Sequence, residues 1–230
     1  MIPTWHITGP LPYERAHELQ HQLVERVAEG TLPGALLLLE HPEVVTLGRR
    51  RGARENVLDE RVPVLQVERG GDATWHGPGQ LVAYPIVPTR DPGAHLRALE
   101  DAVIATLTPL GLDALRDPRS SGVWLRGDTP APLKVCSIGV AVRRWVSSHG
   151  LALNLQVDLS RFNAIRPCGA DASVMTSLHL WLRRPPTRRE LAAPLTEALS
   201  EALGLRFAAP LLVDADELTR LVSAASAEPR

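Results

Sequence analysis

Residues 68–86, ERGGDATWHGPGQLVAYPI, restrict the possible folds of this chain more than any other stretch of the sequence. The segment holds four glycines and two prolines around a single arginine, threonine, tryptophan and histidine, and it ends in an apolar run. Glycine is favoured where the backbone must adopt a positive φ or approach another group closely. We therefore predict a shaped loop that leads into a buried strand.

This loop does not match the common nucleotide-binding patterns. Its glycines precede a strand and not a helix, unlike the dinucleotide fingerprint, and a Walker A loop needs a Gly-Lys pair that this chain lacks. The remaining use of so many glycines is a close approach of the backbone to a ligand. We expect Gly70 and Gly71 to offer backbone N–H groups, Thr74 and His76 to add polar ends, and Trp75 to add an apolar wall. The alternative is a loop that merely turns the chain.

The hydrophobic pattern along the chain predicts a mixture of strands and single helices. Apolar spacing and turn residues predict helices over 12–29, 94–110 and 214–224, and strands over 5–8, 35–40, 43–48, 62–67, 81–87, 121–127, 134–144 and 145–157. A capping box, Thr187 to Glu190, opens a further helix that ends at Gly204. Residues 159–178 are predicted to be irregular. The fold class is therefore α/β (α+β) with a mixed β-sheet flanked by helices, in one domain over 1–230 with a frayed tail at about 225–230.

Composition excludes several classes of function. The net charge of −1 gives no general attraction for nucleic acid, and no apolar run reaches the length of a membrane span. The N-terminus lacks the features of a signal peptide, so we expect a cytoplasmic location. The two cysteines lie 32 residues apart, and we find no His and Cys spacing typical of zinc, so we predict no disulfide framework and no metal. We expect these histidines to lie at the surface or the edge of the core: His6, His17, His21, His95 and His179.

Lys134 is the one lysine beside 24 arginines. Arg is always charged, whereas Lys is compact and can lose its proton. A lysine that persists where arginine is so strongly preferred indicates a chemical role. The alternative is chance survival on a tolerant surface.

Cys168 lies between a proline and a glycine in the irregular stretch RPCGAD. A structural cysteine usually sits in an apolar strand, as Cys136 does in KVCSIG, whereas Cys168 has the setting of a nucleophile on a shaped loop. An ammonium group close to a thiol favours the reactive thiolate. A pair of Cys168 and Lys134 would suit acyl transfer to an amine, although spacing alone does not place them together.

Two further features remain open at this stage. His76 and His149 each stand beside a glycine and are candidates to line a pocket. The stretch LGRRRGARENV contains Arg49, Arg50, Arg51 and Arg54, which form either a solvated loop or a dock for an acidic partner or a phosphate.

The run from Arg69 through Gln80, continued by LVAYPI, resembles the signature of the lipoyl(octanoyl) transferases, which are octanoyl-[acyl-carrier-protein]:protein acyltransferases. The stretches EHPEVVTLGR, LKVCSIGVAVRRWVSSHGLALN and FNAIRPCG resemble the other blocks of that family in the same order, over roughly residues 10–205. The resemblance departs at Ala170, where a larger aliphatic residue is common, and at Asp72, which is a variable position.

The resemblance implies a fold similar to the catalytic domain of biotin and lipoate protein ligases, and a Cys168–Lys134 pair. It implies transfer of octanoyl from octanoyl-acyl carrier protein to a lysine of lipoyl domains, namely those of 2-oxoacid dehydrogenase E2 subunits and the glycine cleavage H protein, in lipoate biosynthesis with no cofactor. The implied substrate-binding residues are Arg69, Gly70, Gly71, Asp72, Ala73, Thr74, Trp75, His76, Ser137, Ile138, Gly139, Gly150, Leu151 and Ala152.

Four other activities stay open beside this one. An ATP-dependent lipoate ligase of the same fold would need no cysteine. An amidotransferase would move octanoyl between two lipoyl-domain proteins and would also use cysteine. A hydrolase could pair a cysteine with His76 or His149, and a non-catalytic protein could simply bind acyl carrier protein.

Overall fold

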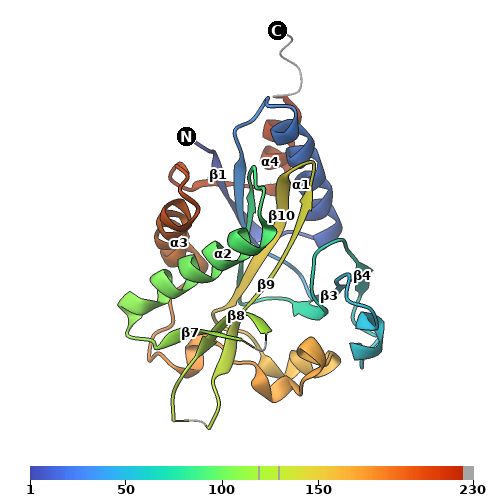
Figure 1. The fold of residues 1–230 in the computed structure, drawn as a ribbon, viewed down its shortest axis with the longest axis vertical. Coiled ribbons are helices and arrows are strands. Elements are labelled where there is room, and N and C mark those ends of the chain that lie inside the picture. Colours follow the sequence, from blue (N-terminus) through green and yellow to red (C-terminus); the bar gives the residue numbers. More distant parts are fainter. Residues whose placement is uncertain (119, 129, 225–230) are drawn as a thin grey trace.

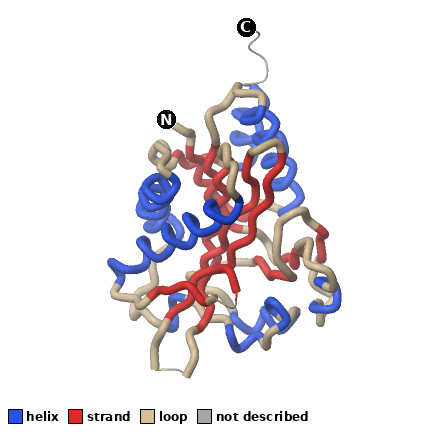
Figure 2. The backbone as a smooth tube through the Cα atoms, viewed as in Figure 1, coloured by secondary structure: helices blue, strands red, loops and turns tan. Residues whose placement is uncertain are grey.

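The computed structural model describes residues 1–118, 120–128 and 130–224, apart from the side chains of Cys168 and Ala224. Figure 1 shows the chain in these bounds, and Figure 2 shows its strands as a central layer between helices. The predicted fraying of residues 225–230 lies outside the described residues. That one domain spans residues 1–230 stays a prediction.

An eight-stranded mixed sheet forms this central layer, in the order β11-β1-β2-β6-β10-β9-β8-β7. Strand β1 pairs in parallel with β2 and β11, and the other neighbours pair antiparallel. The strands are β1 (Thr4–Pro10), β2 (Ala35–Glu40), β6 (Gln80–Ile86), β7 (Ala114–Asp117), β8 (Ser120–Leu125), β9 (Leu133–Arg143), β10 (Val146–Asn154) and β11 (Leu211–Val213). Strand β2 is apolar almost throughout because helices cover the sheet on both faces.

Among the described residues, four helices cover the two faces in pairs. Helices α1 (Tyr13–Ala28) and α4 (Ala215–Ala224) pack on one face, and α2 (Pro92–Leu107) and α3 (Arg188–Leu203) pack on the other. Helix α2 begins at Asp91, whose carboxylate accepts hydrogen bonds from the backbone N–H groups of Gly93 and Ala94. Each face therefore has its own hydrophobic core, and the large sheet separates the two.

A small second sheet lies beside the large one. It consists of β3 (Val44–Leu47), β4 (Val64–Gln66) and β5 (Ala73–His76), in the order β4-β3-β5. Its side chains pack against residues 159–175 in a third core, which contains Trp75, Phe162 and Ile165. Short 3₁₀ turns connect the larger elements. They are η1 (Ala53–Asn56), η2 (Thr108–Leu110) after α2, η3 (Leu159–Ala164), η4 (Pro167–Gly169), η5 (Ala172–Val174) and η6 (Leu178–Leu180).

The predicted mixed sheet flanked by helices is confirmed. The capping box is formed, since the Thr187 hydroxyl accepts from the Glu190 backbone N–H and the Glu190 carboxylate accepts from the Thr187 backbone N–H. The sequence analysis missed β5, β7 and β11. Among the described residues, no helix combines the length and the apolar character that a membrane span requires.

Candidate active site

A pocket opens where α1, the glycine segment and the β9–β10 hairpin meet. Its cavity volume is about 50 Å³, and about 520 Å³ of space separates the surrounding atoms when its open mouth is counted. The lining residues are Tyr13, Arg69, Gly71, Asp72, Ala73, Thr74, His76, Tyr84, Ser121, Lys134, Ser137, Ile138, Gly139, His149, Gly150, Leu151 and Ala152.

Most residues named from the sequence meet on this pocket, although they come from three separate parts of the chain. Tyr13, Tyr84 and Ser121 line it as well and were not named, while His149 was a candidate. The apolar spacing of residues 12–29 indicated that Tyr13 would be buried, but nothing in the sequence placed Tyr13 beside the glycine segment. Gly70 is not among the residues that line the pocket. Its backbone N–H, expected to face a ligand, donates to the carbonyl oxygen of Val140 at 2.9 Å.

Trp75 is not the pocket wall that the sequence suggested. Side chains alternate along a strand, so Thr74 and His76 face the pocket while Trp75 points to the opposite side of β5. Its ring packs on Phe162 with 5.0 Å between ring centroids, and its indole N–H donates to Glu43 Oε1 at 3.0 Å. Trp75 therefore stabilises the small sheet that carries the pocket residues.

Arg69 is held inside the protein by carbonyl oxygens. Its guanidinium donates to the carbonyl and hydroxyl oxygens of Thr46 at 2.8 and 2.9 Å, and to the carbonyl oxygen of Gly70 at 3.0 Å. A Cβ at Gly139 would lie 3.1 Å from Arg69 Cδ, so the glycine lets the arginine cross β9 closely. Arg69 thus joins the glycine segment, β3 and β9 at one wall of the pocket.

Lys134 reaches the pocket from β9 and is 4% exposed. Its ammonium group donates to Ser120 Oγ at 3.1 Å and lies 5.4 Å from the centre of the Trp124 ring. The carbonyl oxygen of Lys134 accepts a 2.9 Å hydrogen bond from the backbone N–H of Thr176. A compact cation is therefore fixed at the pocket by both its side chain and its backbone.

Cys168 lies in the turn η4, which packs against β5 and η1. The backbone N–H of Arg166 donates to the carbonyl oxygen of Asn56, and that of Gly169 donates to the carbonyl oxygen of Arg166. The side chain of Cys168 lies outside the described residues, so its pairing with Lys134 stays a prediction.

The other cysteine has a different environment. Cys136 is fully buried in the core under α2, and its burial raises the pKa of the thiol to about 12. A thiol of that pKa is almost wholly protonated at neutral pH, and it is poorly suited to nucleophilic attack.

Buried histidine and tyrosine side chains lie at the pocket and behind it, and burial disfavours their charged forms. Burial lowers the pKa of His41 to about 4 and holds that of His76 well below its usual value. Burial also raises the pKa of Tyr13 to about 12. His41 Nε2 lies 2.8 Å from the Tyr84 hydroxyl, and His76 Nδ1 lies 3.2 Å from Gln80 Oε1, so these buried groups are hydrogen-bonded.

His149 adopts a backbone conformation that is rare for a residue with a side chain. Its φ is 58°, in the left-handed region, and the next residue, Gly150, has a φ of 158°. A Cβ at Gly150 would lie 2.2 Å from the carbonyl oxygen of Ala83, so glycine is required there. Helix α1 holds this turn of the chain: Gln20 Oε1 accepts from the His149 backbone N–H at 2.7 Å, and the Tyr13 hydroxyl lies 3.1 Å from His149 Nδ1. Such outliers persist where the surrounding structure supports them, and they are frequent at functional sites.

Comparison with known proteins places the chain in a family. The model of the lipoyl protein ligase A/B catalytic domain matches residues 12–200. The chain belongs to this family. Within it, the chain is similar to proteins named octanoyltransferase: one from Geobacter metallireducens is 46% identical over 203 residues, which cover 85% of this chain and 92% of the relative. One from Mycolicibacterium paratuberculosis is 45% identical over 200 residues, covering 85% and 84% of the two chains. The expected family, and with it the acyltransferase class, is confirmed.

Solved structures agree on the fold. A crystal structure of lipoate-protein ligase A bound with ATP superposes with a TM-score of 0.68 at 18% identity, covering 99% of this chain and 97% of the other. A lipoate protein ligase from Thermoplasma acidophilum with bound lipoic acid gives a TM-score of 0.68 at 17% identity, over 97% and 94% of the two chains. These structures share the fold of this chain over nearly all of its length.

Proposed function

We propose that this acyltransferase moves an octanoyl group from octanoyl-acyl carrier protein to the ε-amine of a lysine on lipoyl domains, through a thioester on Cys168. The proposed acceptors are the lipoyl domains of 2-oxoacid dehydrogenase E2 subunits and the glycine cleavage H protein. The observation that carries this proposal is the similarity of 43–48% over most of the chain to proteins named octanoyltransferase. The cytoplasmic location stays a prediction.

In the first half-reaction, the Cys168 thiolate attacks the carbonyl carbon of the octanoyl thioester. The bond between that carbon and the sulfur of the carrier's phosphopantetheine breaks, and the released thiolate takes up a proton from the Lys134 ammonium or a group beside it, which leaves that group able to accept a proton in the next step. The positive charge of Lys134 at the pocket supports a thiolate close to it. Backbone N–H groups near Gly139 and Cys168 are the proposed oxyanion site. One thioester replaces another, so the step is close to neutral in free energy and needs no ATP.

In the second half-reaction, a neutral lysine amine of the lipoyl domain attacks the acyl-enzyme. Lys134 or a group beside it takes the proton from the attacking nitrogen, and the Cys168 thiolate leaves. An amide forms and a thioester is lost. Because an amide is more stable than a thioester, this step drives the overall transfer.

The lining of the pocket supports binding of an apolar acyl chain. Ile138, Leu151 and Ala152 supply apolar side chains to its wall. Burying about seven methylene and methyl groups at roughly 0.8 kcal/mol each would contribute about 5–6 kcal/mol to binding.

Mass spectrometry of the protein after incubation with octanoyl-acyl carrier protein tests the proposal. We expect one octanoyl mass on the peptide that contains Cys168, its loss in Cys168→Ser, and its retention in the matched variant Cys136→Ser. Acylation at Cys136 with none at Cys168 would overturn the assignment. A requirement for ATP and free octanoate would instead indicate a ligase. Faster transfer from an octanoylated lipoyl-domain protein would indicate an amidotransferase, and release of free octanoate would indicate a hydrolase. Carrier binding without any acyl-enzyme would indicate a non-catalytic binder.

A further inference from the structure

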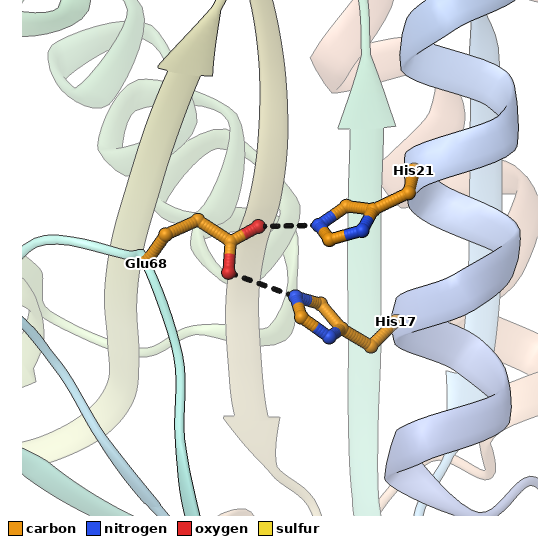
Figure 3. Close-up of side chains that lie close together, drawn as sticks. All are labelled: His17, His21 and Glu68. Atoms are coloured by element: carbon orange, nitrogen blue, oxygen red, sulfur yellow. Dashed lines mark hydrogen bonds and ion pairs between the residues drawn. The ribbon is translucent and has the colours of Figure 1, made fainter.

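His17 and His21 lie one turn apart on α1, and both rings point toward the carboxylate of Glu68 (Figure 3). His17 Nε2 lies 2.8 Å from Glu68 Oε2, and His21 Nε2 lies 2.7 Å from Glu68 Oε1. One ligand atom from each of the three residues falls within 4.8 Å of the other two. Two helical residues four apart share one face, which is why a single carboxylate can meet both rings.

These three residues form the kind of ligand set that binds a transition metal. Two imidazoles and one carboxylate are a known combination for Zn²⁺, whereas Mg²⁺ and Ca²⁺ prefer oxygen ligands alone. Metal–ligand distances of about 2.0–2.2 Å separate ligand atoms by slightly more than the contacts seen here, so small side-chain movements suffice. The side chains of His17, His21 and Glu68 are 24%, 41% and 38% exposed, which leaves an ion a path from solvent.

A second observation at the same place also indicates a ligand. His149 is 2% exposed, and its Nε2 atom has no hydrogen-bond partner among the described residues. That atom faces the cluster, 3.5 Å from Glu68 Oε1. With the Tyr13 hydroxyl on Nδ1, the His149 ring is held in place and can orient the carboxylate.

The neighbouring arginine has oxygen partners of its own. Arg69 directs its guanidinium to oxygens of Thr46 and Gly70, while the Glu68 carboxylate faces the two imidazole rings. A carboxylate and imidazole nitrogens are ligand groups that suit a transition metal.

We propose that His17, His21 and Glu68 bind one Zn²⁺ ion that fastens α1 to the segment carrying Arg69, with His149 orienting Glu68. The signal was present in the sequence as HELQH at 17–21, two histidines four residues apart, and the sequence analysis passed over it. The glutamate of that pattern acts as a general base in metalloproteases. Glu18 is exposed and is not part of this cluster, so we assign the ion a structural and not a proteolytic role.

Zinc titration of the whole protein tests this proposal without any substrate. The Cys168→Ser background removes a competing thiol, and a chelator followed by dialysis removes any metal already bound. We expect one saturable Zn²⁺ site per chain, a higher melting temperature with Zn²⁺, and a visible absorption band of tetrahedral Co²⁺ when cobalt replaces zinc. No saturable zinc binding by this protein would overturn the proposal.

Variants then assign the ligands. We expect His17→Gln and His21→Gln each to weaken zinc binding by more than about 100-fold, and His149→Asn by about 10- to 100-fold. Glu18→Gln, one residue along the same helix, is the matched control and should bind zinc as tightly as the parent. Equal affinity in the His17→Gln/His21→Gln double variant, with its fold checked by circular dichroism, would place the zinc elsewhere and refute the site.

Discussion

The backbone N–H of Thr176 donates a hydrogen bond to the carbonyl oxygen of Lys134, at 2.9 Å. A bridge between Lys134 and Met175 accompanies it. These contacts attach the irregular segment that carries Cys168 to strand β9, which carries Lys134. Two parts of the chain that are remote in sequence are thus built against each other, one of them contributing Lys134 to the pocket.

Lys134→Arg should keep the positive charge but strongly lower the rate of octanoyl transfer. A Cβ at Gly122 would lie 2.8 Å from Lys134 Cε, so the space around this side chain is tight, and a guanidinium is larger and retains its protons. We expect octanoyl transfer to a lipoyl domain to fall by about 10²- to 10⁴-fold, measured as the initial rate. Arg183→Lys, at an exposed position, is the control and should leave the rate unchanged. Full activity of Lys134→Arg would mean that positive charge alone is sufficient.

Charge reversal at Arg49 and Arg51 tests the predicted dock for an acidic partner. Both residues are exposed, whereas Arg50 lies 3.4 Å from the buried carboxylate of Asp72 and is best left in place. Arg49→Glu/Arg51→Glu should weaken binding of acyl carrier protein at low salt, and the difference should shrink as salt screens the charges over about 10 Å at 0.1 M. Fluorescence titration at two salt concentrations measures both effects. Arg220→Glu on α4 is the control, and unchanged affinity in the double variant would reject the dock.

Acid should destabilise the protein partly through His95. Burial lowers the pKa of His95 to about 4, below the value of about 6.5 in an unfolded chain. Between these two values the unfolded state binds more protons, so the stabilising effect is complete above about pH 6.5 and is lost as the pH falls toward 4. The loss is at most about 3 kcal/mol in the free energy of unfolding.

Urea denaturation from pH 4 to 7.5 measures this dependence. His95→Gln and His95→Leu differ in polarity, but both remove the titrating ring. Both should therefore reduce the slope of unfolding free energy against pH, by an amount that corresponds to at most one bound proton. An unchanged slope in both variants would show that His95 does not contribute.

Thr187→Ala should destabilise α3 by about 0.5–2 kcal/mol, because it removes the hydroxyl that accepts the Glu190 backbone N–H at the helix start. The midpoint of urea denaturation measures the loss. Thr108→Ala is a useful control, since the Thr108 hydroxyl donates to a carbonyl oxygen at the end of α2 and caps no N–H group. Equal losses in the two variants would argue against a specific capping effect.

Local signals explain what the sequence predicted well. The bounds of α3 follow from Thr187 and Glu190 at its start and from Gly204 at its end, where φ is 64°. The buried strand β2 follows from a short, continuous apolar run that turn residues bound. The glycine segment was named as a binding segment from its glycines and polar residues, and the β9–β10 hairpin was named because the family resemblance covers it.

Long-range pairing explains what the sequence did not predict. Strand β5 has four residues inside a glycine-rich stretch, and it exists because it pairs with β3. Missing that strand also meant missing that Trp75 points away from Thr74 and His76. Strand β11 pairs with β1 at the other end of the chain, and the Tyr13 hydroxyl meets His149 across 136 residues. None of these partners leaves a local mark on the sequence.

The left-handed turn at His149 makes the N-terminal helix a support for the shape of a distant strand. Side chains of α1 contact β10 and hold a backbone conformation that is rare for a residue with a side chain. A truncation that removes α1 would therefore release this wall of the pocket, although every residue of β9 and β10 remained. Substitutions on the inner face of one helix would thus change the shape of the pocket without altering the residues that line it from the sheet.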